Sequence, residues 1–438
     1  MQPKKSNRQL SFLCPDLLDQ LNPENYLLRL AKAIDWQVFE ESFLPLYATS
    51  GRPGKPIRLM VGLLILKHLE NLSDERVVEA WVQNPYYQAF CGQKRFTWKL
   101  PCHPSDLTYF RRRIKEDGVR KIFEVSIALH GDRAKETEVV ADTTVQEKNI
   151  TFPTDTKLLT KVIAQCLTMA KLEDVKLRRS YKRELKALQR TIRFKSKGRN
   201  QNNWRRALKR LRTIAGILIR ELRRKLSSEA LAIHQQSLDL CDRVQHQQRS
   251  DKNKIYSLHE PDVSCISKGK AHKKYEYGSK ASVAVTKTSG IIVGALSFKG
   301  NPYDGHTLPG VLDQIENIVG QRPAVIICDR GYRGKRQIGT TSIKIPEAGT
   351  KTSSAHEKRQ ARERFRRRAA IEPIIGHLKN DHRMHRNYLK GVIGDTINLM
   401  MACAAFNFRK FIRIIYFLCL KFIGHISRPS VQSVQNCT

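Results

Sequence analysis

The sequence predicts a mixed α/β protein, a sheet with helices that carries a long helical insertion and follows an all-helical N-terminal domain. Apolar residues recur at helical spacing over Ile57–Leu72, before any strand-like run appears. Strand-like runs begin at Glu138 and return only from residue 280, and the basic stretch between them has a helical pattern. The order strand, insertion, hairpin, helix, strand, strand, helix is typical of a mixed sheet covered by helices.

The N-terminal domain, residues 1–135, is predicted to contain three helices. The first is the apolar stretch just named, and Ser73 is placed to cap the second. The third is predicted to begin near Ser105 and to end in three consecutive arginines, Arg111, Arg112 and Arg113. Three short helices of which the last ends in arginine suit a DNA-binding domain. The alternative is a plain helical bundle with a solvated basic face.

The sheet is expected within residues 136–425. A β-branched strand is predicted over 138–145, and Ser289-Gly290 is the predicted turn of a hairpin that spans 280–298. The continuous apolar run 323–328 is typical of a strand buried on both faces. The remaining predicted elements are a helix over 307–318, a short strand over 342–345, a helical block over about 354–389, an apolar helix over 396–422 and a polar tail over 426–438.

The insertion, residues 156–262, is predicted to contain two long helices over 156–250, which are broken at 196–200 and pack as an antiparallel hairpin with a narrow apolar seam that includes Leu172. Residues 171–230 hold 21 Lys and Arg against five Asp and Glu. This charge fits an arm that contacts the DNA backbone. A solvated spacer is the alternative, and the pattern favours neither.

The overall charge points to a polyanionic partner. The chain has 79 Lys and Arg against 41 Asp and Glu, a formal net charge of +38. Such an excess repels itself unless it is neutralised, so nucleic acid is the leading partner class. The longest apolar stretches, such as 414–420, are much shorter than the ~20 residues of a membrane span. The first 17 residues lack a secretory pattern and the cysteines form no CxxC pair, so we expect a cytoplasmic protein without membrane contact.

Two aspartates follow apolar strand runs. Asp142 comes after Val139-Val140-Ala141, and Asp329 comes after the run that ends at Cys328. The carboxyl ends of strands are where sites form in α/β sheets. Carboxylates on neighbouring strands can hold Mg²⁺, which prefers hard oxygen ligands and leaves positions for a phosphate. A single Asp after a strand is a weak signal, because it is more often a turn or cap residue.

A third acid lies in a one-sided basic pattern. At 100° per residue, Phe365, Arg368, Glu372 and Lys379 fall within an arc of about 60° on one helix. Glu372 can ligate a metal, and Arg368 and Lys379 can hold phosphates. Asp304, Glu147 and Asp155 are rival acids, of which Asp304 stands before a predicted helix and has the pattern of a cap or turn.

These residues resemble the signature of the bacterial insertion-sequence DDE transposases, of the type of insertion sequence family five. Phe365-x2-Arg368-x3-Glu372-x6-Lys379 is similar to the family's Tyr-x2-Arg-x3-Glu-x6-Lys block. Asp142 and Asp329, the latter in Asp329-Arg330-Gly331-Tyr332, resemble its first and second acids. The block Gly300–Leu308 and the stretches 51–112 and 394–409 are also similar to the family. Phe365 departs from the pattern because it lacks the phenolic hydroxyl, and the insertion has no counterpart in the signature.

The resemblance implies that residues 136–425 form an RNase H-like catalytic domain with Asp142, Asp329 and Glu372 as metal-binding catalytic acids. It implies Mg²⁺ as cofactor, with two ions expected and Mn²⁺ able to substitute. Phe365, Arg368 and Lys379, together with Arg111, Arg112 and Arg113, would contact DNA. The protein would cut DNA at the ends of its own element and join the 3′-hydroxyl to target DNA. It would act as a homodimer in the bacterial cytoplasm, associated with the nucleoid.

Two other functions share these residues. An RNase H-like nuclease would use the same acids to cut nucleic acid without joining strands. A DNA-binding protein that no longer catalyses would keep the charge, although loss of catalysis is expected to erase at least one of the acids.

Overall fold

The computed structural model describes residues 16–193, 199–267, 273–346 and 369–426 and five single residues, 2, 354, 356, 359 and 366. The chain forms two compact units. The first unit comprises Met1–Glu147, Lys280–Phe298 and Pro302–Thr438, and the second unit comprises Lys148–Ser279 and Lys299–Asn301. Most of 347–368 and the whole of 427–438, which includes nearly all of the predicted polar tail, lie outside the described residues.

The described N-terminal elements of the first unit are all helical. In order they are η1 (Leu17–Gln20), α1 (Tyr26–Ala33), α2 (Gln37–Phe43), η2 (Leu44–Leu46), α3 (Ile57–Leu69), α4 (Asp74–Gln83), α5 (Pro85–Phe90), α6 (Pro104–Ala128) and η3 (Gly131–Ala134). Every residue of α3 except Arg58 is buried, as expected of a helix that is apolar on nearly every side. As predicted, Ser73 caps α4, since its side chain accepts a hydrogen bond from the Arg76 backbone N–H.

Helix α6 is longer than the sequence predicts. It continues beyond the three arginines to Ala128, with non-helical backbone angles at Lys115 (φ 53°, ψ −152°). The predicted helix corresponds to the part before this break. The second part continues because Val119, Ile122 and Phe123 on one face are buried in the core.

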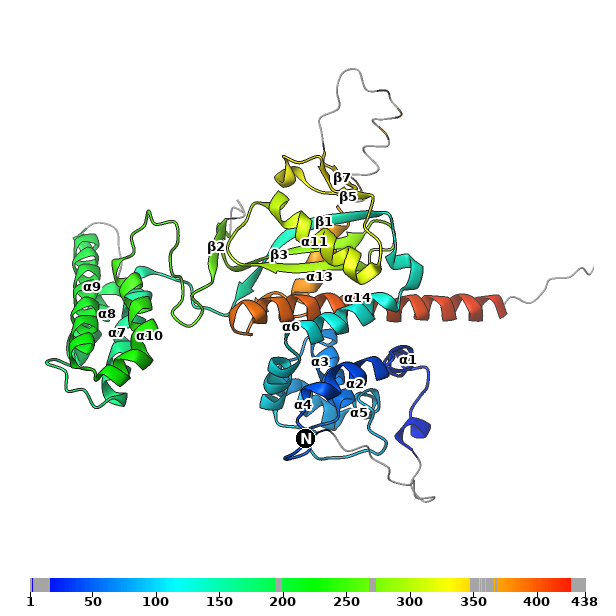
Figure 1. Cartoon of the computed structure of the whole chain (residues 1–438), viewed down its shortest axis with the longest axis horizontal. Coiled ribbons are helices and arrows are strands. Elements are labelled where there is room, and N and C mark those ends of the chain that lie inside the picture. The colour runs from blue at the N-terminus through cyan, green and yellow to red at the C-terminus, as the bar shows by residue number, and fades with distance from the viewer. Residues whose placement is uncertain are drawn as a thin grey trace, which may run out of the picture. The chain divides into compact units, whose positions relative to one another are not determined.

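The sheet of the first unit is mixed, which confirms the predicted α/β class. Its strands are β1 (Glu138–Lys148), β3 (Tyr275–Thr286), β4 (Ile292–Phe298), β5 (Val325–Ile327), β6 (Gln337–Ile338), β7 (Thr341–Lys344) and β8 (Arg386–Asn387). They lie in the order β3-β1-β5-β7-β6, and β4 pairs with β3 and β8 with β1. Strands β1, β5 and β7 pair in parallel, whereas β3 and β4 form the predicted antiparallel hairpin (Figure 1).

Two helices pack on β4. They are α11 (Asp304–Val319) and the long helix α14 (Gly391–Ile426). Helix α14 also packs against α3 and α6, so it joins the sheet and the N-terminal helices in one hydrophobic core (Figure 1). Among the described residues it is the one helix long and apolar enough to cross a membrane, over Gly391–Tyr416. The most apolar window of this helix is 83% buried inside the protein, as is usual for a core helix.

The helical block predicted over 354–389 is wrong in its second half. Helix α13 (Ile371–Asn380) ends where Asp381 follows, and the chain then forms β8 on the edge of β1. Arg383 has a left-handed backbone (φ 65°), which turns the chain away from the helix axis. Pairing with a strand distant in sequence therefore replaces the helix that the local pattern indicates.

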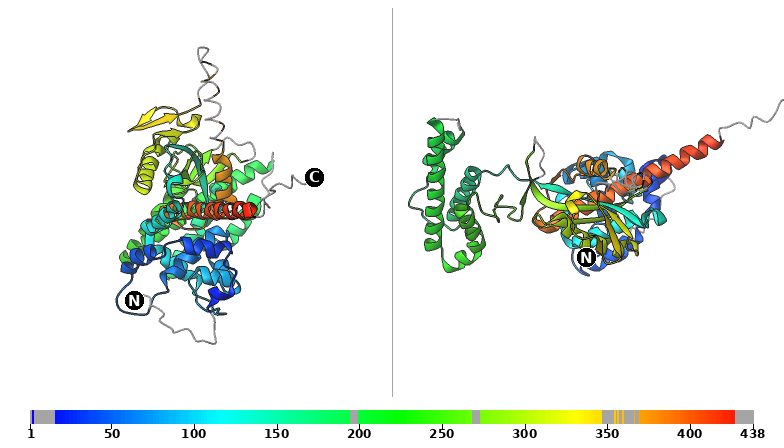
Figure 2. Two further views of the ribbon diagram at one scale, coloured as in Figure 1. Left: turned by 90° about the vertical axis from the view of Figure 1, so that its right-hand side faces the viewer. Right: turned by 90° about the horizontal axis from the view of Figure 1, so that it is seen from above.

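The described residues of the second unit form four helices in place of the two that the sequence predicts. They are α7 (Asp155–Leu172), α8 (Lys182–Arg193), α9 (Arg199–Lys225) and α10 (Ser228–His246), and α9 packs against the other three (Figure 2). The left-handed backbone of Asp174 (φ 48°) keeps the chain from continuing as a helix after α7. The side chain of Ser227 caps α10. Leu172, assigned to the predicted apolar seam, is 71% exposed. The four helices enclose a core of their own, and strand β2 (Ser264–Ser267) pairs with the first residues of β3.

Candidate active site

Asp142 and Asp329 lie at the same level of two adjacent parallel strands. Val140 on β1 is paired with Ile327 on β5, and each aspartate is two residues beyond its member of this pair. Asp329 leaves the sheet and begins the short 3-10 helix η4 (Arg330–Tyr332). Asp142 lies inside β1 and not at its end, because the strand continues to Lys148. The pairing of β1 with β5 therefore brings together two acids that are 187 positions apart in the chain.

Backbone N–H groups orient both carboxylates. The N–H of Thr143 donates to Oδ1 of Asp142 over 2.7 Å, and the N–H of Gly331 donates to Oδ1 of Asp329 over 2.8 Å. Such bonds restrict the rotation of each carboxylate. Both side chains are thus fixed before any ligand arrives.

Asp304 is a third carboxylate at this place. Its Oδ1 accepts hydrogen bonds from Nζ of Lys280 (2.8 Å) and from the hydroxyl of Thr143 (2.9 Å). A Cβ atom added to Gly331 would lie 2.9 Å from Oδ1 of Asp329 and 3.0 Å from Oδ2 of Asp304. Asp304 is the first residue of α11, whose N-cap is Tyr303, so it is not the cap that its sequence pattern indicates. Its carboxylate lies instead beside Thr143 and Gly331, whose N–H groups hold the other two acids. Its position in the block Gly300–Leu308 was the signal that could have found it.

The hydroxyl of Tyr332 is buried among these acids. Tyr332 is 1% exposed, and its hydroxyl has no hydrogen-bond partner in the part of the chain that the structure describes. Burial, followed by the nearby Cys328 thiol and the charges of Asp142, Asp304 and Asp329, raises the pKa of Tyr332 well above its usual value. The Tyr332 hydroxyl therefore stays protonated, and no described residue accepts a hydrogen bond from it.

Glu372 is in the first turn of α13, and its side chain is exposed. Among the described residues, no three or more His, Cys, Asp or Glu side chains are grouped so as to hold a metal ion. The structure therefore brings Asp142 and Asp329 together and does not add Glu372 to them in such a group. The role of Glu372 as a third acid stays a prediction.

The basic stripe around Glu372 is described only in part. Phe365 and Arg368 lie outside the described residues, and α13 begins after both, at Ile371. Lys379 lies seven positions after Glu372 on the same helix, which places both on one face, and it is half-buried.

The three arginines of α6 have different environments. Arg111 is 5% exposed, and its guanidinium donates to both carboxylate oxygens of Asp74, over 3.0 and 2.6 Å. Buried in this way, Arg111 holds α6 to α4, and its role as a DNA contact stays a prediction. Arg112 and Arg113 are exposed, and the Arg113 guanidinium lies 4.2 Å from the centre of the Tyr47 ring.

Asp74 is shared with a second buried cation. Nζ of Lys67 lies 2.8 Å from Oδ1 of Asp74, and its side chain is 7% exposed. Burial lowers the pKa of Lys67 to about 8, although the charge of Asp74 opposes the shift. Burial acts to raise the pKa of Asp74, but the hydrogen bonds and charges of Arg111 and Lys67 hold it well below its usual range. The three side chains form one charged network inside the N-terminal helices.

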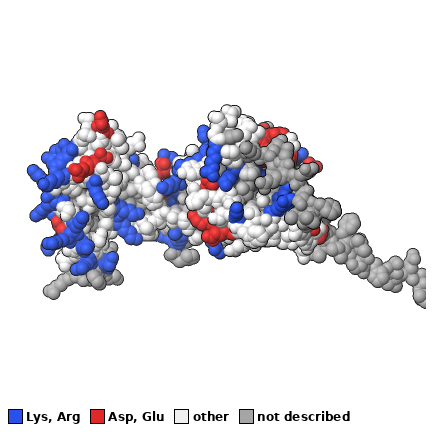
Figure 3. Space-filling view, turned by 90° about the horizontal axis from the view of Figure 1, so that it is seen from below, with Lys and Arg blue, Asp and Glu red and all other residues white. Residues whose placement is uncertain are grey.

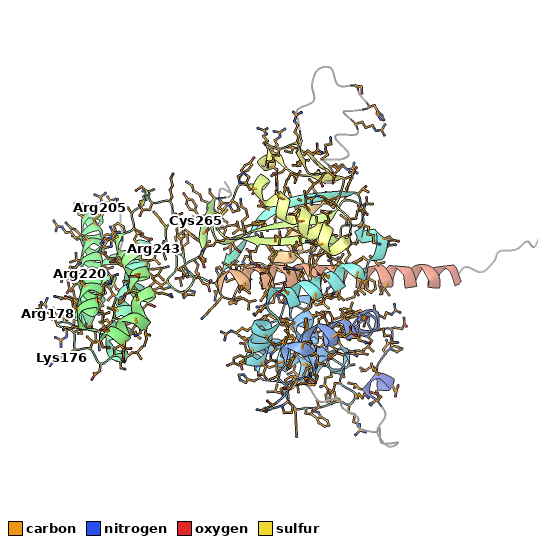
Figure 4. All side chains as sticks on the ribbon, in the orientation of Figure 1. Lys176, Arg178, Arg205, Arg220, Arg243 and Cys265 are labelled. Atoms are coloured by element: carbon orange, nitrogen blue, oxygen red, sulfur yellow. The ribbon has the colours of Figure 1, made fainter. Side chains whose placement is uncertain are left out.

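The second unit has a basic surface (Figure 3). Arg205 and Lys209 on α9 are exposed, but Arg212, which helical spacing places on the same face, is half-buried and donates to the Gln247 carbonyl oxygen over 3.3 Å. Figure 4 shows Arg205 and Arg220 on α9 and Lys176 and Arg178 in the segment before α8. Exposed cations of α8 and α9 include Lys182, Arg183, Lys186, Arg190, Arg206 and Arg224.

Comparison with known proteins adds two family matches and one relative. Residues 15–113 match the family described as "Transposase domain (DUF772)", and residues 242–408 match the family described as "Transposase DDE domain". The second match contains Asp304, Asp329 and Glu372, whereas Asp142 precedes it. A protein of Rhizobium meliloti, "Uncharacterized protein ORF8 in nfe locus", is 41% identical over 189 residues, which cover 42% of this chain and 91% of that protein. No solved structure matches the chain.

Proposed function

Because the chain belongs to the insertion-sequence DDE transposases, we propose that it binds the ends of its own insertion element, cuts the DNA with Mg²⁺ and joins the freed 3′-hydroxyl to target DNA. The main support is the placement of Asp142 and Asp329 side by side on β1 and after β5. We further infer that the element is of the family-five type, that the catalytic domain is RNase H-like, and that the helical residues before it form the DNA-binding N-terminal domain.

The residues around Asp142 and Asp329 fit a divalent cation. Their carboxylates are the hard oxygen donors that Mg²⁺ prefers. The Tyr332 hydroxyl, a buried donor without a partner among the described residues, is placed to bond an oxygen ligand brought by the cation or the DNA. When bound, two Mg²⁺ ions, for which Mn²⁺ can substitute, supply charge stabilisation to the attacking and leaving oxygens of an in-line displacement.

Different residues of the protein are proposed to bind the metal and to contact the DNA. We propose that Asp142, Asp329 and Glu372 hold the metal, and that Arg368, Lys379 and Phe365 contact the DNA next to the site. Arg112 and Arg113, exposed on α6, are the proposed contacts of the N-terminal helices. We propose a homodimer on DNA that acts in the cytoplasm at the nucleoid and has no membrane contact.

Purified full-length protein should cut a duplex that carries its element's end, and the 3′-end should appear joined to a target plasmid. The assay uses Mg²⁺ and a labelled end fragment, with a fragment of scrambled end sequence as control. Joined product confirms the proposal. Cleavage without joining would favour a nuclease, and binding without cleavage would favour a DNA-binding protein that no longer catalyses.

Replacing Glu372 with glutamine is expected to abolish cleavage while end binding persists. The amide keeps the shape of the side chain and removes the charge that would hold Mg²⁺. Lys379→Met on the same face of α13 is the companion variant, which is expected to weaken DNA binding and not metal binding. Cleavage at the wild-type rate by Glu372→Gln would remove this residue from the site.

The basic surface of the second unit is expected to add sequence-independent DNA affinity. Each cation that neutralises a phosphate contributes about 0.9 to the slope of log K against log salt. Reversing Arg205 and Lys209 to glutamate should therefore weaken binding to all sequences and flatten that slope. The variant Arg205→Lys with Lys209→Arg keeps the charge and is the matched control. An unchanged slope in the reversed variant would make the second unit a solvated spacer.

A further inference from the structure

Asp304 is tied to a buried lysine. The side chain of Lys280 is 8% exposed, and its Nζ donates to Oδ1 of Asp304 and, over 2.6 Å, to the carbonyl oxygen of Pro302. This lysine stands inside strand β3. Burying a charged pair is costly unless its geometry and hydrogen bonds are good. Here the buried pair of Lys280 and Asp304 lies next to the residues that hold Asp142 and Asp329.

Thr143 connects this pair to Asp142. Its hydroxyl donates to Oδ1 of Asp304, and its backbone N–H donates to Oδ1 of Asp142. Thr143 is 6% exposed, so it has little freedom to rotate away from either bond. A change in the position of Asp304 is therefore passed to Asp142 through a single residue.

Gly331 connects the pair to Asp329. Its N–H orients the Asp329 carboxylate, and the space where a side chain would begin is closed on two sides by Asp329 and by Oδ2 of Asp304. In the part of the chain that the structure describes, Oδ2 of Asp304 makes no hydrogen bond, whereas Oδ1 has two. The free oxygen thus faces the loop that carries the second acid.

The charge of Lys280 cancels that of Asp304, so the pair adds no net charge to the site. The negative charge available to a cation comes from Asp142 and Asp329. Asp304 is therefore better suited to orienting ligands than to being one. Groups that orient metal ligands typically change metal affinity by 10–100-fold when they are removed.

We propose that the Lys280–Asp304 ion pair positions the Asp142 and Asp329 carboxylates for the divalent cation, through Thr143 on one side and Gly331 on the other. Asp304 is a positioning residue and not itself a metal ligand. This inference rests on the proposed function, because it assumes that the two carboxylates bind a metal. The hydroxyl of Tyr332, which has no partner among the described residues and lies beside the same three acids, is the independent sign that a ligand binds here.

The test is Mn²⁺ binding to the full-length protein without DNA, followed by the loss of the free-ion signal in electron paramagnetic resonance. Asp304→Asn should weaken Mn²⁺ affinity by about 10–100-fold. Thr143→Val, which removes only the hydroxyl and leaves the Lys280–Asp304 pair, should weaken it by at least several-fold. Thr143→Ser keeps the hydroxyl and should bind as the wild type does. Asp313→Asn, on the same helix as Asp304 but with a 61% exposed side chain, is the matched control.

The outcomes separate this inference from the function on which it rests. Wild-type Mn²⁺ affinity in both Asp304→Asn and Thr143→Val overturns the positioning role, even if melting temperatures fall. If Asp142→Asn abolishes Mn²⁺ binding in the same series, the proposed metal site stands without it. Absence of Mn²⁺ binding to the wild type would overturn both. If Asp304→Asn fails to fold because Lys280 is left unpaired, Thr143→Val against Thr143→Ser decides.

Discussion

Replacing Asp142 or Asp329 with asparagine is expected to abolish DNA cleavage and to leave DNA binding intact. Each amide keeps the size of the side chain and its bond from the backbone N–H, but it removes the charge that would attract Mg²⁺. Stabilisation by the bound metal is worth several kcal/mol in such reactions, and each 1.36 kcal/mol is tenfold in rate. We therefore expect cleavage to fall by at least about a hundredfold.

The measurement is a single-turnover cleavage assay combined with a gel-shift titration of the same end fragment. Asp132→Asn is the control, because Asp132 lies in the same unit and its side chain is 96% exposed. The control should cleave as the wild type does. If either Asp142→Asn or Asp329→Asn cut at an undiminished rate in Mg²⁺, that residue could not be an essential metal ligand.

The second large effect is expected at Asp74, where alanine should destabilise the first unit by about 3–5 kcal/mol. Removing one partner of a buried ion pair leaves the other charges uncompensated, and here both Lys67 and Arg111 would be left. The shift in the urea midpoint of unfolding measures the effect, provided that the slope of the transition is unchanged.

Glu79→Ala is the matched control for Asp74→Ala. Glu79 belongs to the same helix and pairs with Arg76, but its side chain is 54% exposed. An exposed pair of this kind contributes at most about 1 kcal/mol. Equal losses in the two variants would show that the network of Lys67, Asp74 and Arg111 is no stronger than a surface ion pair.

Several elements could be predicted from the sequence because their causes are local. Ser73 caps α4 through a hydrogen bond to a residue three positions away, so the signal and its effect lie in one window. Gly290 has a positive φ of 65° in the turn between β3 and β4, and a glycine in that turn marks the hairpin. The run 323–328 contains a strand, β5, with parallel neighbours on both sides, as its continuous apolar character predicts.

The partners of the charged residues could not be predicted in this way. Arg111 follows a helical pattern that looks solvent-exposed, and only packing of α6 against α4 shows that Asp74 neutralises it. In the second unit, the sequence does not predict the breaks between helices near Asp174 and Ser227, because the basic pattern continues across them. A charged residue fits the same sequence pattern whether its side chain is surrounded by water or by a buried counter-ion.

The sequence by itself determined the positive charge, the mixed α/β class and the membership in the DDE transposases, because composition, periodicity and motif spacing are properties of the chain. Only the tertiary structure decided which acids meet. Asp304 is 161 positions from Thr143, and its sequence pattern shows only the start of a helix. Strand pairing and the approach of α11 bring its carboxylate to Asp142 and Asp329, since hydrogen bonds between distant segments leave no periodic trace in the sequence.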